Sequence, residues 1–238
     1  RCGYEQVADK LIPLTNHADA EIRRNAFRAL GMTRDPRATE VVIKALGDTN
    51  RTISAVGAEA LRDIQDPRAM PVLLDTISAA GPKSALYDEF SAIGSIGDRR
   101  VVPILVSMIS STNSVVKDLA IAPLGQIKDP RAVPALIEVL SGEDDERIKN
   151  SAITALGFIG DFRGAEPLIR AFNGNRSWHY RDNCAWALSR IGYSNALDVV
   201  AGHFLASSSK LEESISVRHV EELGDSRAVP TLLNVLGK

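Results

Sequence analysis

Apolar residues recur along the chain at positions that match from one segment of 31 or 32 residues to the next. In each segment two apolar positions lie four residues apart, which places them on one face of a helix because a helix turns once every 3.6 residues. Both positions follow a recurrent Asp, by seven and eleven residues. They hold Val42/Leu46, Leu73/Ile77, Leu105/Ile109, Leu136/Leu140, Leu168/Phe172, Val200/Phe204 and Leu232/Leu236. The pattern predicts a first helix in every segment.

A second helix is predicted just before each Asp. Nine residues before the Asp, six of seven segments carry a small side chain, and Glu89 is the exception. The small residues are Ala26, Gly57, Ala120, Ala152, Cys184 and Ser216. Four residues later each segment carries an aliphatic one: Leu30, Leu61, Ile93, Leu124, Leu156, Leu188 and Val220. Small side chains let helices approach closely, and one helix pair could not bury these faces alone, so the pattern predicts a stack of helix pairs.

The recurrent Asp opens a motif, Asp-Pro-Arg-Ala. Full copies begin at Asp35, Asp66 and Asp129, and weaker copies at Asp98, Asp161, Tyr193 and Asp225. An Asp side chain accepts hydrogen bonds from the free N–H groups of a first helical turn, and Pro fits the first helical position because no N–H is needed there. We therefore expect each motif to begin the first helix of a repeat.

Two stretches, Asp129-Pro130-Arg131-Ala132-Val133-Pro134 and Ala155-Leu156-Gly157, resemble the short HEAT-like repeats named after the phycobilisome lyases. The resemblance implies an all-α fold: a right-handed α-solenoid of antiparallel helix pairs, of the HEAT or armadillo type, with about seven and a half repeats. We expect a single domain over residues 1–238. The chain begins within an expected helix at 4–14 and ends within another at 227–236, without a polar capping repeat. We therefore expect it to continue at one or both ends.

Composition narrows the function further. The net charge of −2 and pI of about 6.1 give no overall attraction to nucleic acid or to an anionic membrane. The two cysteines form no CxxC pair, and the chain has no run of 18 apolar residues, so we expect a cytoplasmic protein without a membrane span. The four histidines make no metal-binding motif, and none is followed by Glu, unlike in the HEAT-like deoxyhypusine hydroxylases. We predict no metal and no catalytic residue.

The Arg of the motif recurs in six of seven repeats, as Arg37, Arg68, Arg100, Arg131, Arg163 and Arg227. One interpretation is a basic ladder for phosphates. The other is a structural ladder, in which each guanidinium binds a neighbouring Asp or a carbonyl at a helix end. We favour the structural ladder because the Arg always follows a capping residue.

A second basic row precedes the Asp by twelve residues. Its members are Arg23, Ser54, Leu86, Lys117, Lys149, Arg181 and Glu213, of which four are basic. The row falls in the first turn of the second helices, which we expect to line the concave face. It could attract an acidic partner. Because Glu213 ends the row and Asp118 and Asp182 lie beside it, we favour a solvated face of mixed charge.

Both tryptophans of the chain fall within residues 173–186. Trp, Tyr and Arg are the residue types enriched at binding hot spots. Trp186 occupies a variable position of the repeat and is expected to be exposed, although the tryptophans could instead fill a gap in weaker packing. The predicted partner-binding residues are Trp178, Tyr180, Arg181, Trp186, Lys149 and Lys117.

These observations favour a non-catalytic scaffold that binds another protein, or a second copy of itself, on its concave face. The resemblance implies one alternative, a bilin lyase or a chromophore-detaching subunit acting on phycobiliproteins. An aromatic and Arg patch could then hold a tetrapyrrole with its propionates, and the bilin would be the only cofactor. No residue matches a known catalytic motif, so an enzymatic role is not the favoured interpretation.

Overall fold

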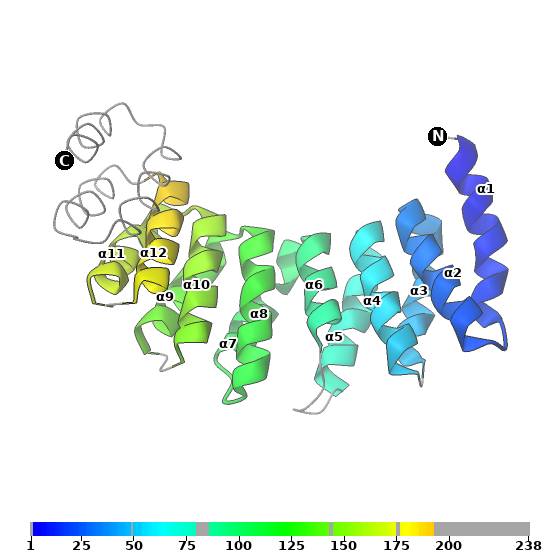
Figure 1. Ribbon diagram of the computed structural model, residues 1–238, viewed down its shortest axis with the longest axis horizontal. Helices are drawn as coiled ribbons and strands as arrows, with labels where there is room; N and C mark the ends of the chain where they lie inside the picture. Colours follow the sequence, from blue (N-terminus) through cyan, green and yellow to red (C-terminus); the bar gives the residue numbers. More distant parts are fainter. Residues whose placement is uncertain (1, 49, 80–85, 143–144, 175–176, 193–238) are drawn as a thin grey trace. The chain divides into compact units, whose positions relative to one another are not determined.

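The computed structural model describes residues 2–48, 50–79, 86–142, 145–174 and 177–192. Every regular element in these ranges is a helix, and the helices follow one another in pairs (Figure 1). The predicted all-α solenoid of helix pairs is therefore confirmed. The chain divides after Pro123 into two compact units, Arg1–Pro123 and Leu124–Lys238, here called the N-terminal and C-terminal units.

First and second helices of the repeats alternate along the chain. The first helices are α1 (Cys2–Leu11), α3 (Thr39–Ile43), α5 (Met70–Ala79), α7 (Val102–Ile109), α9 (Val133–Gly142) and α11 (Ala165–Gly174). The second helices are α2 (Ala20–Thr33), α4 (Arg51–Ile64), α6 (Tyr87–Ile96), α8 (Ser114–Ile127), α10 (Glu146–Ile159) and α12 (Trp178–Ile191). The motifs at Tyr193 and Asp225 lie outside the described residues.

Each described motif begins a helix as predicted. The Asp35 side chain accepts a hydrogen bond from the backbone N–H of Arg37 at 2.9 Å. The same cap forms at Asp66, Asp98, Asp129 and Asp161. The three residues after the cap form a 3₁₀ turn, such as Pro36–Ala38, and the α-helix starts after it. The motif therefore sets the start of the first helix through a tighter turn than an α-helix would make.

Each second helix ends on a left-handed residue directly before the next repeat. The residues and their φ angles are Arg34 (52°), Gln65 (58°), Gly97 (72°), Lys128 (55°), Gly160 (72°) and Gly192 (71°). This conformation stops the helix and suits Gly, which has no Cβ to clash with the backbone. The joint between repeats is thus a left-handed residue followed by a cap.

Close approach of second helices forms the core within each unit. A Cβ built on Gly31 would lie 2.7 Å from the Cα of Ala60, and one on Gly125 would lie 2.9 Å from the Cα of Ala155. Only glycine therefore allows α2 to pack this closely on α4. The predicted aliphatic core is buried, with exposed fractions between 0 and 1% for Leu30, Leu61, Ile93, Leu124, Leu156 and Leu188.

One charged residue stands at the position where other repeats carry a small one. Glu89 in α6 is fully buried, and neither of its carboxylate oxygens accepts a hydrogen bond. Its nearest counter-charge is Arg51 at the start of α4, whose Nη1 lies 3.4 Å from Oε1 and whose side chain is half exposed. The small-residue pattern therefore has one costly exception, because a buried carboxylate without hydrogen bonds loses its hydration.

Candidate protein-binding surface

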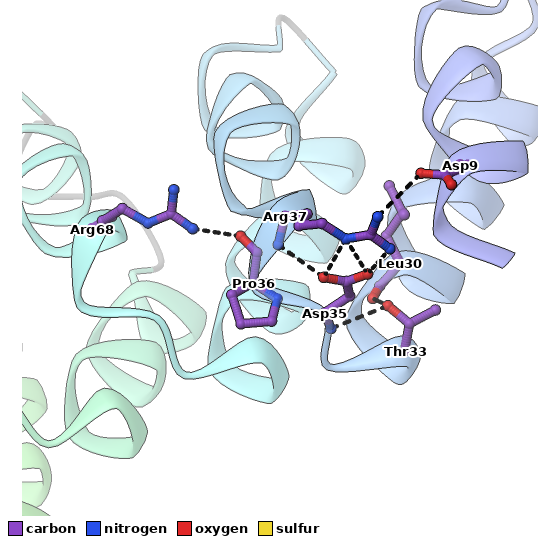
Figure 2. Close-up of polar contacts among 7 residues, drawn as sticks. All are labelled: Asp9, Leu30, Thr33, Asp35, Pro36, Arg37 and Arg68. Atoms are coloured by element: carbon purple, nitrogen blue, oxygen red, sulfur yellow. Dashed lines mark hydrogen bonds and ion pairs between the residues drawn. The ribbon is translucent and has the colours of Figure 1, made fainter. Parts of the chain in front are cut away.

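The motif arginines bind within the repeat and to the repeat before it. In the described repeats each guanidinium pairs with the Asp two residues earlier, at 2.5 to 2.8 Å, for Arg37, Arg68, Arg100, Arg131 and Arg163. Arg68 also donates to the carbonyl of Pro36 at 2.5 Å, as Figure 2 shows, and Arg163 donates to that of Pro130 at 2.9 Å. The structural ladder is confirmed at these two joints.

The ion pairs of the ladder shift the acidity of the capping residues. The hydrogen bond from Arg68 is the main cause that lowers the pKa of Asp66 to about 2, and the backbone N–H of Arg68 and the Thr39 hydroxyl add to it. Hydrogen bonds from the paired Arg likewise lower the pKa of Asp35, Asp98 and Asp161. These carboxylates stay ionised at neutral pH and hold their arginines in place. The motif arginines are therefore part of the scaffold.

Two residues of the second basic row, Arg181 and Ser54, bind the turn between the two helices of their repeat. Nε of Arg181 donates to the carbonyl of Phe172 at 3.3 Å, and its guanidinium lies 6.0 Å from the centre of the Phe172 ring. At the same position of another repeat, the Ser54 hydroxyl donates to the carbonyl of Leu46 at 3.1 Å. Arg181 thus anchors α12 to α11. Lys117 lies half-buried in α8, in the N-terminal unit.

The buried side of α12 carries Tyr180 and Cys184. Tyr180 is 3% exposed and Cys184 is fully buried. Burial raises the pKa of each to about 12, and the neighbouring Cys184 and Glu146 add to the shift at Tyr180. The thiol therefore stays protonated at neutral pH and is not a nucleophile. Tyr180 lies at the position that Ile53 and Ile148 fill in other repeats, so the repeat pattern itself signals its burial.

The exposed side of the same helix carries Trp186. Its indole packs edge-on against Phe158 of α10, with ring centres 5.2 Å apart and planes at 77°. Phe158 is 40% exposed, and Trp186 is partly exposed. We call these two residues the aromatic pair. Trp186 is therefore less exposed than the sequence suggested, because one side of it is covered by Phe158. The side chain of Trp178, which begins α12, lies outside what the structure describes.

Gly157 brings the aromatic pair together. A Cβ on Gly157 would lie 2.6 Å from Cζ3 of Trp186 and 2.9 Å from the Cα of Ala187. Its absence lets α12 approach α10 and places the indole against the next residue of α10, Phe158. Phe158 was not among the predicted site residues. Its position carries Met32, Asp63, Ser95, Gln126 and Arg190 in other repeats, a mostly polar set that indicates a solvent-facing site.

Two other predicted residues meet at an open cavity in the C-terminal unit. The cavity measures about 280 Å³ and is lined by Lys149 of α10 and Tyr180 of α12, with Ser141 and Arg170 from α9 and α11. The predicted site is therefore divided. Trp186 belongs to the aromatic pair, Lys149 and Tyr180 to the cavity, and Arg181 to the helix turn.

Metal-ligand groups and membrane-spanning helices were the remaining features of interest in the described part of the chain. Among the described residues, no three His, Cys, Asp or Glu side chains converge to form a metal site. None of the described helices is long and apolar enough to cross a membrane.

Comparison with known proteins gives a family and a fold. A family model described as HEAT repeats matches residues 8–84, 90–157 and 133–216. No curated protein matches the chain in sequence.

Several solved structures are similar to the chain. The phycocyanin lyase complex of CpcE and CpcF from Nostoc sp. PCC7120 is 22% identical, with a TM-score of 0.48 over 92% of this chain and 82% of that one. Human deoxyhypusine hydroxylase is 20% identical, with a TM-score of 0.48 over 98% and 89%. Kap95p, solved with RanGDP, is 12% identical, with a TM-score of 0.56 over 98% of this chain and 38% of Kap95p. At these identities the likeness concerns the fold alone.

Proposed function

The chain belongs to the HEAT-repeat family, and on that premise we propose that it is a non-catalytic scaffold that binds another protein. A stack of repeats presents successive second helices side by side, which suits recognition of an extended surface. The partner binds on the exposed side of α10 and α12, in the C-terminal unit. Protein binding also agrees with the structure of Kap95p, which is bound to RanGDP.

The aromatic pair is the observation that supports this proposal. Aromatic residues make up only 5% of the chain, yet two of them meet edge to face across neighbouring second helices and stay partly exposed. Trp is the residue type most enriched at hot spots, and its large apolar ring yields much binding energy for little conformational entropy. The edge-to-face contact with Phe158 holds the indole in one orientation before a partner arrives, which lowers the cost of binding.

Substitution of the aromatic pair tests the proposal. The tagged 238-residue chain is first used to capture its partner from cells that produce the protein. The purified partner is then titrated by calorimetry against the parent chain, Phe158→Ala and Trp186→Ala. Loss of a hot-spot aromatic costs about 2 kcal/mol, so each variant should bind roughly 30-fold more weakly. Phe162→Ala is the matched control, since Phe162 is 75% exposed and lies outside the pair. It should bind as the parent chain does.

The outcomes separate the possible partners. Sedimentation of the chain alone at increasing concentration shows whether the partner is a second copy, in which case Trp186→Ala should keep it monomeric. Parental affinity in folded Phe158→Ala and Trp186→Ala variants would contradict the aromatic pair as the binding surface. Circular dichroism and the melting temperature of each variant confirm that it is folded.

A bilin lyase is the more specific alternative function that the resemblance of the repeat motif suggests. Asp129 caps a helix and Gly157 allows close packing, so the motif residues have structural roles that any such repeat requires. Titration with a free bilin tests this alternative. A red-shifted absorbance with quenching of tryptophan fluorescence, both lost in Trp186→Ala, would favour it over the protein scaffold.

A further inference from the structure

The cavity of the C-terminal unit is lined by two cations from neighbouring repeats. Lys149 reaches it from α10 and Arg170 from α11. Neither side chain forms an ion pair or a hydrogen bond with any residue that the structure describes. Arg163 of the same unit differs, because Asp161 and the Pro130 carbonyl occupy its guanidinium. The cavity is therefore lined by two cations and by no carboxylate.

Tyr180 adds a neutral hydrogen-bond donor to the same space. The side chain is 3% exposed and lines the cavity, and its hydroxyl makes no hydrogen bond to a described residue. Because the residue lines the cavity, its hydroxyl can donate a hydrogen bond to an acceptor that enters there. Burial raises the pKa of Tyr180 to about 12, so the hydroxyl keeps its proton at neutral pH. Glu146 contributes to that shift, but it is not among the lining residues.

The size of the cavity limits what it can hold. A volume of about 280 Å³ is just below the usual range for small-molecule pockets and corresponds to roughly nine water molecules. Leu140 and Pro167 form apolar wall beside the polar groups. One small polar group with a short apolar stem fits these walls, whereas a large planar cofactor exceeds the volume.

We infer that this cavity binds an oxyanion, a carboxylate or a phosphate group, held by Arg170, Lys149 and Tyr180. The guanidinium offers two parallel N–H donors, the ammonium a point charge and the phenol a third donor, a set that matches the several acceptor oxygens of such a group. The anion is free in solution or belongs to an acidic side chain of a bound protein. The site does not depend on the aromatic pair.

The inference is tested on the full 238-residue chain by calorimetry and by the melting temperature at constant ionic strength. The three probes are sodium phosphate, sodium succinate and a short peptide rich in Glu, each compared with sodium chloride. At least one probe should bind saturably. Arg170→Gln and Lys149→Gln should each weaken that binding at least tenfold, and Tyr180→Phe should weaken it about threefold without loss of folding.

Two variants serve as controls. Lys44→Gln removes an exposed cation at the position of the repeat that Arg170 occupies, but outside the cavity, and should leave the affinity unchanged. Trp186→Ala should also leave it unchanged, which separates this site from the proposed protein surface. Tightest binding of phosphate or succinate identifies a free anion as the ligand, and tightest binding of the peptide identifies an acidic segment. No saturable binding of any probe, or equal affinity in the parent chain, Arg170→Gln and Lys149→Gln, would overturn the inference.

Discussion

Gly157 matters because of the side chain that it lacks. A methyl group there would lie within 2.6 Å of Trp186 and 2.9 Å of the Ala187 backbone, and a backbone cannot move aside cheaply. Gly157→Ala should therefore force α10 and α12 apart and lower the free energy of unfolding by about 2 kcal/mol. Chemical denaturation followed by tryptophan fluorescence measures this change.

Gly142 provides the comparison for Gly157. It ends α9, and a Cβ built there would meet no atom within 4 Å. Gly142→Ala should leave the stability unchanged or raise it by up to about 1 kcal/mol, because Ala loses less backbone entropy on folding. Equal effects of the two substitutions would show that close packing at Gly157 is not what holds α12.

Glu89 is the residue at which the small-residue pattern fails. Its carboxylate is fully buried without hydrogen bonds, and the half-exposed Arg51 returns little of the lost hydration. Glu89→Gln keeps the shape and removes the charge, so it should raise the free energy of unfolding by about 1 kcal/mol at pH 7. The midpoint of urea unfolding measures the change.

A matched substitution at Glu59 separates burial from charge. Glu59 is partly exposed and pairs with Arg62 at 3.5 Å. Glu59→Gln should change the stability by less than about 0.5 kcal/mol, as is usual for such pairs. A lower urea midpoint for Glu89→Gln would mean that the contact with Arg51 outweighs the cost of burial.

At the scale of elements, the motif arginines join one repeat to the one before. Arg163 binds both Asp161 and the Pro130 carbonyl, and its planar fork presents N–H groups in fixed directions that suit both acceptors. Arg163→Lys should therefore cost about 1 kcal/mol in stability. Arg100, which is 82% exposed and pairs only with Asp98 among the described residues, is the control. Arg100→Lys should cost less than about 0.5 kcal/mol, and an equal loss in both variants would rule out the carbonyl bond as the cause.

The capping carboxylates make helix starts sensitive to acid. The pKa of Asp66 is lowered to about 2 in the folded chain, so its contribution is complete above the unfolded value near 3.8 and is lost as the pH falls from about 4 to 2. Asp66→Asn keeps a cap but loses the charge. Between pH 5 and 2, the free energy of unfolding of the variant should therefore fall by about 1 kcal/mol less than that of the parent chain.

Urea unfolding at several pH values measures this difference. Asp75→Asn is the control, because Asp75 is exposed and has no ion pair with a described residue. It should follow the pH dependence of the parent chain. A parental pH dependence in Asp66→Asn would exclude the Asp66–Arg68 pair as a source of the acid response.

The whole molecule has a balanced charge, which bears on the partners it can bind. Its net charge is −2, and several of its arginines are occupied by carboxylates. Non-specific binding to nucleic acid needs free cations that displace counterions from phosphates. We therefore expect no binding of the chain, at about 10 μM and physiological salt, to a labelled DNA duplex or RNA strand in fluorescence anisotropy. A salt-sensitive rise in anisotropy would contradict this.

Most of the fold could be predicted from the sequence because capping, small and aliphatic residues recur at the same positions in each repeat. Asp35, Gly57 and Leu61 have the roles that their positions indicate, and comparison over several repeats removes the ambiguity of any single segment. The left-handed residues were not predicted, since Arg34 and Lys128 give no signal of that conformation.

The candidate site was less predictable because it depends on departures from the repeat. Trp186 was identified from its residue type, but its partner Phe158 lies 28 positions away in sequence, and only the packing at Gly157 brings the two together. Tyr180 was expected on a binding surface, yet it occupies a core position of the repeat. The cavity arises from side chains of four helices, and no local pattern specifies such a space.

The ladder between repeats has a consequence for how such a chain can grow. Arg68 and Arg163 reach across the joint to a main-chain carbonyl, an acceptor that every residue supplies whatever its side chain. This arginine–carbonyl bond therefore does not depend on which side chain the neighbouring repeat carries at the acceptor. A repeat that is duplicated, deleted or exchanged at the gene level can therefore still form this bond with its new neighbour. The solvent-exposed positions of each copy are meanwhile free to change, as at Phe158 and Trp186.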